Sequence, residues 1–216
     1  MGKTAYALQL AEQYGGPILN ADSRQIYRDI PIGTAAPTAE EQARVKHYFV
    51  GTLGLEDYYS AAQYEQDAMA LLTKLFAEHD TLVMAGGSMM YIDAVCNGID
   101  DIPPVDDETR AFLKPRDEQE GLEPLVADLR LLDPEYYDIC DKRNPKRVVH
   151  ALEICYMTGR TFTSFRVRKQ VQRPFNIEKI ALNRPRPELF DRINRRVDLM
   201  REEGLLDEVR RVLPYR

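Results

Sequence analysis

Met1-Gly2-Lys3-Thr4 opens the chain and stands directly ahead of a helical pattern. Its last three residues match the end of the phosphate-binding loop G-x-x-x-x-G-K-[ST], a pattern of ATP-binding proteins. In such a loop glycine lets the backbone approach a phosphate, lysine places its charge on the phosphate oxygens, and the hydroxyl is offered to Mg²⁺. Gly2, Lys3 and Thr4 are therefore the candidate phosphate site, with Thr4 as candidate metal ligand. The chain lacks the strand and first glycine of the full loop, so we expect a truncated core.

Two short apolar runs continue this pattern. Residues 18–21 form the first and end at Asp22, and residues 81–85 form the second and end at Gly86-Gly87-Ser88. Helical patterns over 4–14, 61–78 and 89–96 alternate with these runs. Such alternation indicates a parallel sheet with helices on its faces. The predicted fold class is α/β, with a P-loop-type parallel sheet core.

The pattern changes after residues 100–105, where two prolines interrupt the chain. Helices are predicted over 108–114, 121–132, 145–158 and 186–213, and one more strand over 177–183. We therefore expect a core formed by residues 1–105 and 177–216, with a mainly helical, basic insertion at 106–176. The chain stops just after a helix, so we expect the core to be truncated at this end as well.

Composition excludes several classes of protein. The chain has 216 residues, of which 44% are hydrophobic and 30% charged, as in ordinary soluble domains. No apolar run approaches the roughly 18 residues that span a bilayer. Its three cysteines and three histidines are scattered, which excludes a disulfide framework or a Cys/His metal cluster. We expect a cytoplasmic protein without a membrane partner, acting as a monomer.

Charge is unevenly distributed along the chain. Residues 142–173, the basic block, hold nine Lys or Arg and a single acid, Glu153, whereas residues 1–141 hold ten basic and twenty-six acidic residues. Such segregation favours a polyanionic partner such as nucleic acid. The alternative is a solvated helix surface whose cations pair with the acidic body. The nine cations are Lys142, Arg143, Lys146, Arg147, Arg160, Arg166, Arg168, Lys169 and Arg173.

Three groups of polar residues are predicted to meet at one edge of the sheet. Ligands of open α/β sheets bind beyond the carboxyl ends of the strands. The phosphate loop, the segment Asp22-Ser23-Arg24-Gln25 and the segment 86–88 all fall there. Phosphate would sit on Lys3 and Thr4, Asp22 could accept a proton, and Ser88 would offer a hydroxyl. The structural alternatives are a turn or N-cap role for Asp22 and an N-cap role for Ser88.

Several segments, in one order, match a known set of motifs. They are ADSRQIYR at 21–28, IGTAAP at 32–37, YSAAQY at 59–64, GGSMMY at 86–91, PPVDDETR at 103–110, NPKRVVHALE at 144–153, and the run from Arg192 to Val209. On these motifs the sequence resembles the tRNA dimethylallyltransferases, which modify the adenosine beside the anticodon, over nearly its whole length. Departures include Ala36 for Lys, Met89-Met90 for Gly-Leu, Lys146 for Gln and His150 for Arg.

The resemblance implies a prenyl transferase. It would move a dimethylallyl group from dimethylallyl diphosphate to the exocyclic N6 amine of adenosine 37 in the tRNA anticodon stem-loop. It assigns Asp22 as general base and Ser88 as a second catalytic residue, with Mg²⁺ held through Thr4. Without the first half of the loop, we expect this chain to be impaired. The diphosphate would be bound by Gly2, Lys3, Thr4 and Arg186, and tRNA by Asp22, Ser23, Arg24, Gln25, Ser88, Arg110, Lys146, Arg147 and His150.

Three other functions use the same features. A small-molecule kinase of this fold shares the Gly-Lys-Thr loop and a strand-end aspartate, and the basic block would be its lid. A prenyl transferase acting on free adenine nucleotides would share the site but would not need the basic insertion. A non-catalytic RNA-binding chain would need only the basic block. The length of that block suits RNA better than a lid.

Overall fold

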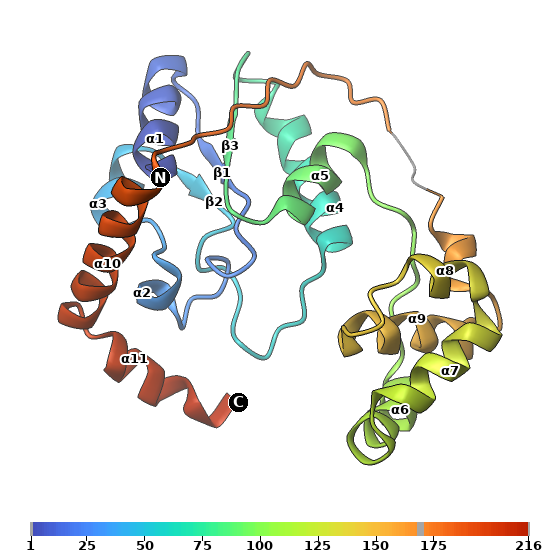
Figure 1. The fold of residues 1–216 in the computed structure, drawn as a ribbon. Helices are drawn as coiled ribbons and strands as arrows, with labels where there is room; N and C mark the ends of the chain where they lie inside the picture. Colours follow the sequence, from blue (N-terminus) through green and yellow to red (C-terminus); the bar gives the residue numbers. More distant parts are fainter. Residues whose placement is uncertain (1, 168–170, 216) are drawn as a thin grey trace. The chain divides into compact units, whose positions relative to one another are not determined.

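The computed structural model describes residues 2–167 and 171–215 (Figure 1). The contacts within the chain divide it into two compact units. The core unit comprises Met1–Gly98 and Val171–Arg216, and the helical unit comprises Ile99–Gln170.

The boundaries between the units lie earlier in the chain than the predicted 105/106 and 176/177. Ile102 and Val105 pack into the apolar core of the helical unit and so belong to it. Arg173 instead donates to the backbone oxygen of Val95 at 2.7 Å. Phe175 lies against Phe76 with 5.1 Å between ring centroids, also in the core unit.

A three-stranded parallel sheet lies in the core unit. Its strands are β1 (Ile18–Asn20), β2 (His47–Tyr48) and β3 (Val83–Ala85), in the order β2-β1-β3. In the register, Ile18 pairs with His47 on one side and with Val83 on the other. Because all three strands are parallel, their carboxyl ends meet at a single edge, as the sequence predicted.

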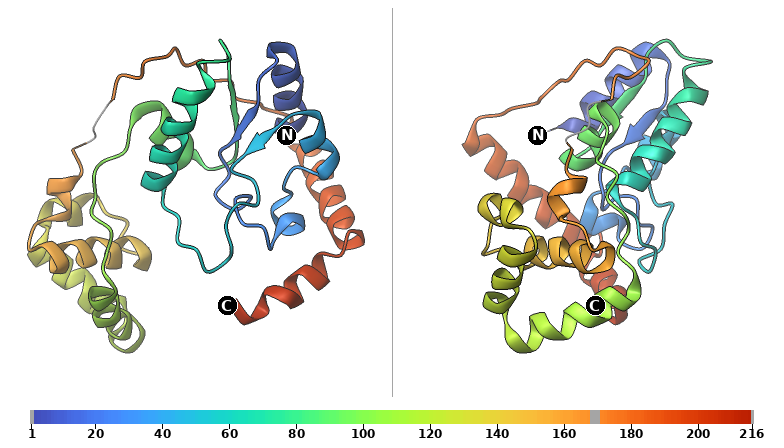
Figure 2. Two further views of the ribbon diagram at one scale, coloured as in Figure 1. Left: turned by 180° about the vertical axis from the view of Figure 1, so that it is seen from behind. Right: turned by 90° about the vertical axis from the view of Figure 1, so that its right-hand side faces the viewer.

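Alternating side chains of β1 pack on opposite faces of the sheet. Ile18 lies in one cluster with the buried face of helix α1 (Lys3–Tyr14). Leu19 faces the other way and packs with α4 (Ala61–Leu75) and α5 (Met89–Asn97). Figures 1 and 2 show α1 on one side of the sheet and the α4–α5 pair on the other. This is an α/β architecture of helices covering a parallel sheet.

The core unit also contains two short helices between β1 and β2 and two helices near the C-terminal end of the chain. They are α2 (Pro31–Thr34), α3 (Ala39–Arg44), α10 (Arg186–Glu202) and α11 (Leu205–Val212), with a final 3₁₀ turn at Leu213–Tyr215. The single helix predicted over 186–213 is wrong, since Gly204 takes a left-handed backbone conformation with φ of 100° and separates α10 from α11. The strand predicted over 177–183 is also wrong: this segment pairs with no strand in the described structure, and Ile180 is 53% exposed.

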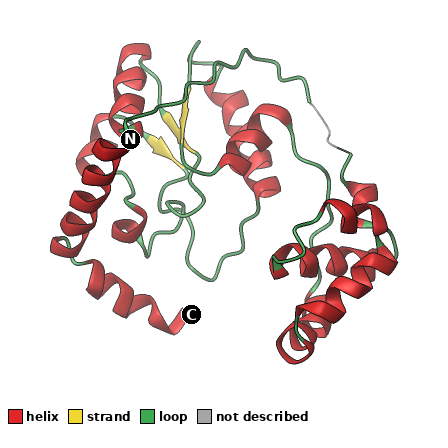
Figure 3. Cartoon of the chain, viewed as in Figure 1, coloured by secondary structure: helices red, strands yellow, loops and turns green. Residues whose placement is uncertain are grey.

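Helices make up the helical unit (Figure 3). They are α6 (Asp107–Glu120), α7 (Leu122–Leu132), α8 (Pro134–Ile139) and α9 (Pro145–Thr158), followed by a 3₁₀ helix at Phe162–Phe165. Leu113, Leu125 and Leu152 are completely buried and form the centre of its core. Within 2–167 and 171–215, no helix is long and apolar enough to cross a membrane.

Candidate active site

The ends of β1 and β3 approach each other so closely that only glycine fits between them. Ala21 donates its N–H to the oxygen of Ala85 at 2.9 Å, and Ser88 donates its N–H to the oxygen of Ala21 at 3.0 Å. A Cβ on Gly86 would stand 2.0 Å from the Ala21 oxygen. This close approach sets the segment 86–88 directly beside the turn that begins at Asp22.

Asp22 and Lys3 converge beside Gly87. A Cβ on Gly87 would lie 3.1 Å from Oδ2 of Asp22 and 3.3 Å from Nζ of Lys3. The ammonium of Lys3 donates to the Gly86 oxygen at 3.0 Å, which anchors it at the strand end. The structure therefore brings together a cation and a carboxylate from segments that the sequence placed at this edge.

The Asp22 carboxylate also shapes its own turn. Its Oδ1 accepts the N–H of Arg24 at 3.0 Å, the pattern of an Asx turn. The turn role considered for Asp22 is thus present in the structure, and it leaves Oδ2 directed toward Gly87.

Ser88 is joined to the Asp22 turn rather than to its own helix. It stands at the N-cap position of α5, yet its side chain makes no capping hydrogen bond there. Its Oγ instead accepts the N–H of Ser23 at 2.7 Å and donates to the Ser23 hydroxyl at 2.8 Å. Ser88 is therefore the N-cap residue of α5 by position, as considered from the sequence, but its hydroxyl bonds to Ser23 and links the two segments of the site.

Gly2, Lys3 and Thr4 form the start of α1 beside the same edge. Gly2 takes a left-handed conformation with φ of 90°, which glycine adopts without strain. Lys3 and Thr4 then occupy the first helical positions, where unpaired backbone N–H groups favour an anion.

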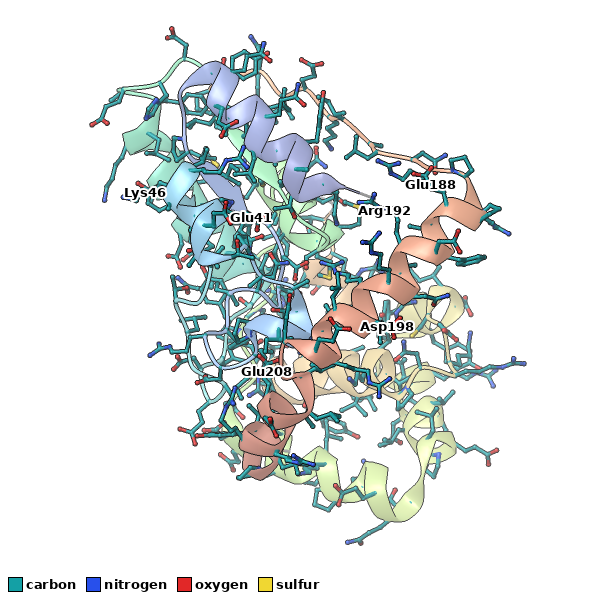
Figure 4. The ribbon with its side chains drawn as sticks, turned by 90° about the vertical axis from the view of Figure 1, so that its left-hand side faces the viewer. Glu41, Lys46, Glu188, Arg192, Asp198 and Glu208 are labelled. Carbon is teal, nitrogen blue, oxygen red and sulfur yellow. The ribbon has the colours of Figure 1, made fainter. Side chains whose placement is uncertain are left out.

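These groups line one side of a cavity of about 590 Å³ in the core unit. Lys3, Thr4 and Asp22 belong to its wall, and arginines from α10 close the opposite side. Those arginines are Arg192, Arg195 and Arg196. Figure 4 shows Arg192 projecting from α10 toward the N-terminal end of α1. Its Nη2 would lie 3.9 Å from a Cβ on Gly2.

Arg186, the arginine predicted to bind diphosphate, is exposed at the first position of α10 and does not line this cavity. The face of α10 that does line it carries Leu189, Arg192, Ile193, Arg196 and Leu199, which recur at three- and four-residue spacings. This helical periodicity was visible in the sequence and could have identified Arg192 and Arg196. What the sequence did not show is that this face turns toward the phosphate loop.

Gln25 serves a structural role. Its Nε2 donates to the backbone oxygens of Thr34 at 3.1 Å and Ala35 at 2.9 Å, which holds the loop that forms another part of the cavity wall. The amide nitrogen of Gln25, predicted to contact tRNA, is therefore already engaged. Arg24, its neighbour, is exposed.

A stacked aromatic pair joins α4 to α5, the helix that follows Ser88. The rings of Tyr64 and Tyr91 lie 4.2 Å apart and nearly parallel. Burial, with smaller contributions from Tyr27 and Asp22, raises the pKa of Tyr91 to about 12. Tyr91 thus stays neutral near pH 7.

Residues 25–216 match the sequence model of the IPP transferase family. The chain belongs to this family. It is 64% identical over all of its length to tRNA dimethylallyltransferase 1 of Phocaeicola vulgatus and spans 72% of that protein. It resembles the crystal structure of the tRNA isopentenylpyrophosphate transferase of Bacillus halodurans, with a TM-score of 0.61, 34% identity and coverage of 98% of this chain and 66% of that one. A eukaryotic dimethylallyltransferase acting on tRNA shares the fold, with a TM-score of 0.72 and 23% identity over 99% of this chain and 53% of that one.

In this IPP transferase, the other predicted tRNA contacts lie on the helical unit. Lys146, Arg147 and His150 are exposed on α9, on the side away from the buried Val148 and Leu152. His150 Nδ1 lies 3.5 Å from Glu153. Arg110 is exposed on α6.

Several cations of the basic block lie over aromatic rings. Lys142 Nζ is 4.3 Å from the ring centre of Tyr137, and the guanidinium of Arg160 is 4.4 Å from that of Phe165. Arg166 lies 5.0 Å from the ring of Tyr136. Such stacking holds a cation in place without neutralising it. Arg168 and Lys169 lie outside the described residues.

Arg173 differs from the rest of the block. Its side chain is 8% exposed and forms an ion pair with Glu65, while it also donates to the backbone oxygens of Ala94 and Val95 at the end of α5. For this member of the block, pairing within the protein is the correct interpretation. Arg173 is therefore removed from the set of candidate RNA contacts.

Proposed function

We propose that this chain catalyses transfer of a dimethylallyl group from dimethylallyl diphosphate to the N6 amine of adenosine 37 in tRNA. The observation that carries the proposal is the cavity in which Lys3, Asp22 and the arginines of α10 face one space. A diphosphate leaving group needs the cations, and an amine nucleophile needs the carboxylate. The names of the relatives point to the same activity.

The phosphate end of the substrate would bind at the start of α1. Gly2, Lys3 and Thr4 would act as the end of a P-loop, with Arg192 supplying a second cation in place of Arg186. As the bond between the allylic carbon and the diphosphate oxygen breaks, charge grows on that oxygen, and these groups stabilise it.

The residues at this position fit Mg²⁺. Within the described residues no group of three or more His, Cys, Asp or Glu could hold a metal by itself. Mg²⁺ bound with phosphates takes only one or two protein oxygens and keeps several waters. Thr4 would supply the first oxygen and the diphosphate the next. Bound there, the ion would add charge stabilisation to the leaving group.

Asp22 would act as the general base. The N6 amine forms a bond to the allylic carbon, and its proton passes to Oδ2, the oxygen of Asp22 that is not used by the Arg24 N–H. An adenine in a stacked loop cannot reach this position, so the nucleotide must be extruded from its stack. Ser23 and Ser88, joined by their hydroxyls, form the lip over which it would pass.

The helical unit would bind the anticodon stem-loop through its backbone phosphates. The stacked cations of the basic block support this, since Lys142, Arg160 and Arg166 are ordered by rings rather than by carboxylates. In this proposal the chain acts as a monomer. The three buried free cysteines suit a reducing compartment such as the cytoplasm.

The function is tested by transfer of a labelled dimethylallyl group from its diphosphate to tRNA, with AMP and ATP as alternative acceptors. We expect labelled tRNA and no labelled nucleotide. Labelling of AMP or ATP would instead favour the adenine-nucleotide enzyme, and phosphate transfer from ATP to a small molecule would favour a kinase. Binding of tRNA without transfer would indicate an RNA-binding chain.

A further inference from the structure

Glu208 is a buried carboxylate that no step of the proposed reaction uses. It is 2% exposed, although most of α11 lies at the surface. Its Oε2 accepts the N–H of Ile32 at 2.8 Å and its Oε1 accepts the N–H of Gly33 at 2.7 Å. Figure 4 shows Glu208 on α11 beside the short helix α2. Burying a carboxylate costs free energy unless its oxygens accept hydrogen bonds. Because both oxygens of Glu208 accept N–H groups of α2, separating α11 from α2 would break two charge-assisted hydrogen bonds.

Helix α2 is held at both ends by side chains from distant segments. At its start Pro31 has no N–H, Glu208 binds the next two amides, and Thr34 donates to Ile30. At its end Gln25 donates to the oxygens of Thr34 and Ala35. Because Gln25 and Thr34 line the cavity, α2 connects Glu208 to the cavity wall.

Gly33 allows α11 to lie directly on α2. A Cβ at this position would stand 3.1 Å from Oε1 of Glu208 and 3.4 Å from Cδ1 of Leu205. The close approach of the two helices is thus matched by a residue without a side chain.

Helix α10 is linked along the chain to this attachment. None of its residues is buried, so it has little packing of its own, and it continues through Gly204 into α11. We propose that Glu208 is a positioning residue, which fixes α11 to α2 and so holds the arginines of α10 opposite the phosphate loop. This inference rests on the proposed use of the cavity for a diphosphate.

The test compares Glu208→Gln with Asp207→Asn. Glutamine keeps the size of the side chain but replaces one acceptor oxygen by an amide NH2 donor, so one α2 N–H loses its partner. We expect faster hydrogen exchange at Ile32 and Gly33, weaker binding of inorganic pyrophosphate, and a KM for dimethylallyl diphosphate raised about tenfold with kcat nearly unchanged. Asp207→Asn is the matched control, because it removes the same charge from the same helix at a 69% exposed position that pairs with nearby Arg210.

A second pair of variants covers the case in which Glu208→Gln fails to fold. Gly33→Ala places a methyl group against Oε1 and should raise the same KM. Glu208→Asp shortens the side chain by one carbon, and combined with Gly33→Ala it should restore part of the loss. Such coupling between contacting positions is what a double-mutant cycle measures. Strictly additive effects would overturn the inference.

Two further outcomes also decide the matter. A Glu208→Gln protein with a lower Tm but wild-type KM and pyrophosphate affinity would show that Glu208 serves stability alone, and the positioning role would be lost. If the wild-type chain transfers no prenyl group to tRNA, the proposed function fails, while the exchange and pyrophosphate measurements still test Glu208. Failure of the wild-type chain to bind pyrophosphate would overturn both.

Discussion

Asp22 bears the proton transfer in the proposed reaction, and the structure offers a variant that removes only this role. Asparagine keeps an oxygen that accepts the Arg24 N–H, so the turn should persist. We expect Asp22→Asn to lower turnover by about 10²–10⁴-fold, the range for loss of a general base, with tRNA affinity little changed. Single-turnover transfer to tRNA measures the first quantity and filter binding the second.

The control for this variant is Asp29→Asn, which removes a carboxylate from an exposed position on the same loop between β1 and α2. It should transfer the prenyl group at the wild-type rate. Normal turnover by Asp22→Asn would mean that this carboxylate only shapes its turn.

Arg192 and Arg186 give opposite expectations for binding of the diphosphate. Arg192 lines the cavity and approaches Gly2, whereas Arg186, at the start of α10, does not line it. Hydrogen bonds to charged groups contribute about 1.5–3 kcal/mol, so Arg192→Ala should raise the KM for dimethylallyl diphosphate about 10- to 100-fold. Arg186→Ala should leave it near the wild-type value. Steady-state kinetics at saturating tRNA separates the two, and the reverse result would restore the assignment made from the sequence.

The elements that the sequence predicted well are those whose pattern is local. Helices α1, α4, α5 and α9 follow from apolar periodicity, and the ends of β1 and β3 place Asp22 and Ser88. Helix α2 has four residues and is held by Gln25 and Glu208, so no local pattern reveals it. Helix α3 was missed although its capping box, Thr38 with Glu41, is visible in the sequence.

The incorrect predictions for residues 177–183 and 186–213 also concern features that depend on more than the local sequence pattern. The segment 177–183 looks like a short strand, but a strand needs a neighbour to pair with, and pairing is a long-range property. The periodicity of 186–213 continues across Gly204, where a left-handed backbone conformation separates the two helices. The orientation of α10 toward the phosphate loop is a long-range property, so the sequence alone could not favour Arg192 over Arg186.

The junction of β1 and β3 provides a stability test of the site's framework. A methyl group at residue 86 would meet the Ala21 backbone at 2.0 Å, and neither strand end can move without disturbing the sheet. We expect Gly86→Ala to destabilise the fold by about 3 kcal/mol, the upper part of the usual range for overpacking. Gly54→Ala is the control, since its Cβ would find only Asp57 Oδ2 at 3.6 Å. Equal thermal midpoints for the two variants would show that the strand ends are free to separate.

For the whole molecule, segregation of charge is the property that the sequence showed most directly. Its net charge is −6, yet the basic block carries nine cations. The structure refines this description, because Arg173 is buried against Glu65 and α5 while Lys142, Arg160 and Arg166 lie over rings. An ordered cation loses little freedom when it binds a phosphate, so these three should contribute most to a polyanion site.

Replacing Lys142, Arg160 and Arg166 together by glutamine should weaken tRNA binding across all sequences. Each phosphate that a cation neutralises releases counterions, so the dependence of log affinity on log salt should flatten by about one unit for each phosphate that is no longer bound. Arg210→Gln is the matched control, because it removes a cation that is paired with Asp207 at 2.7 Å in the core unit. Titration of tRNA at several salt concentrations measures the slope. A triple variant with a lower Tm but unchanged tRNA affinity and slope would show that these cations only stabilise the helical unit, and the RNA role of the block would be withdrawn.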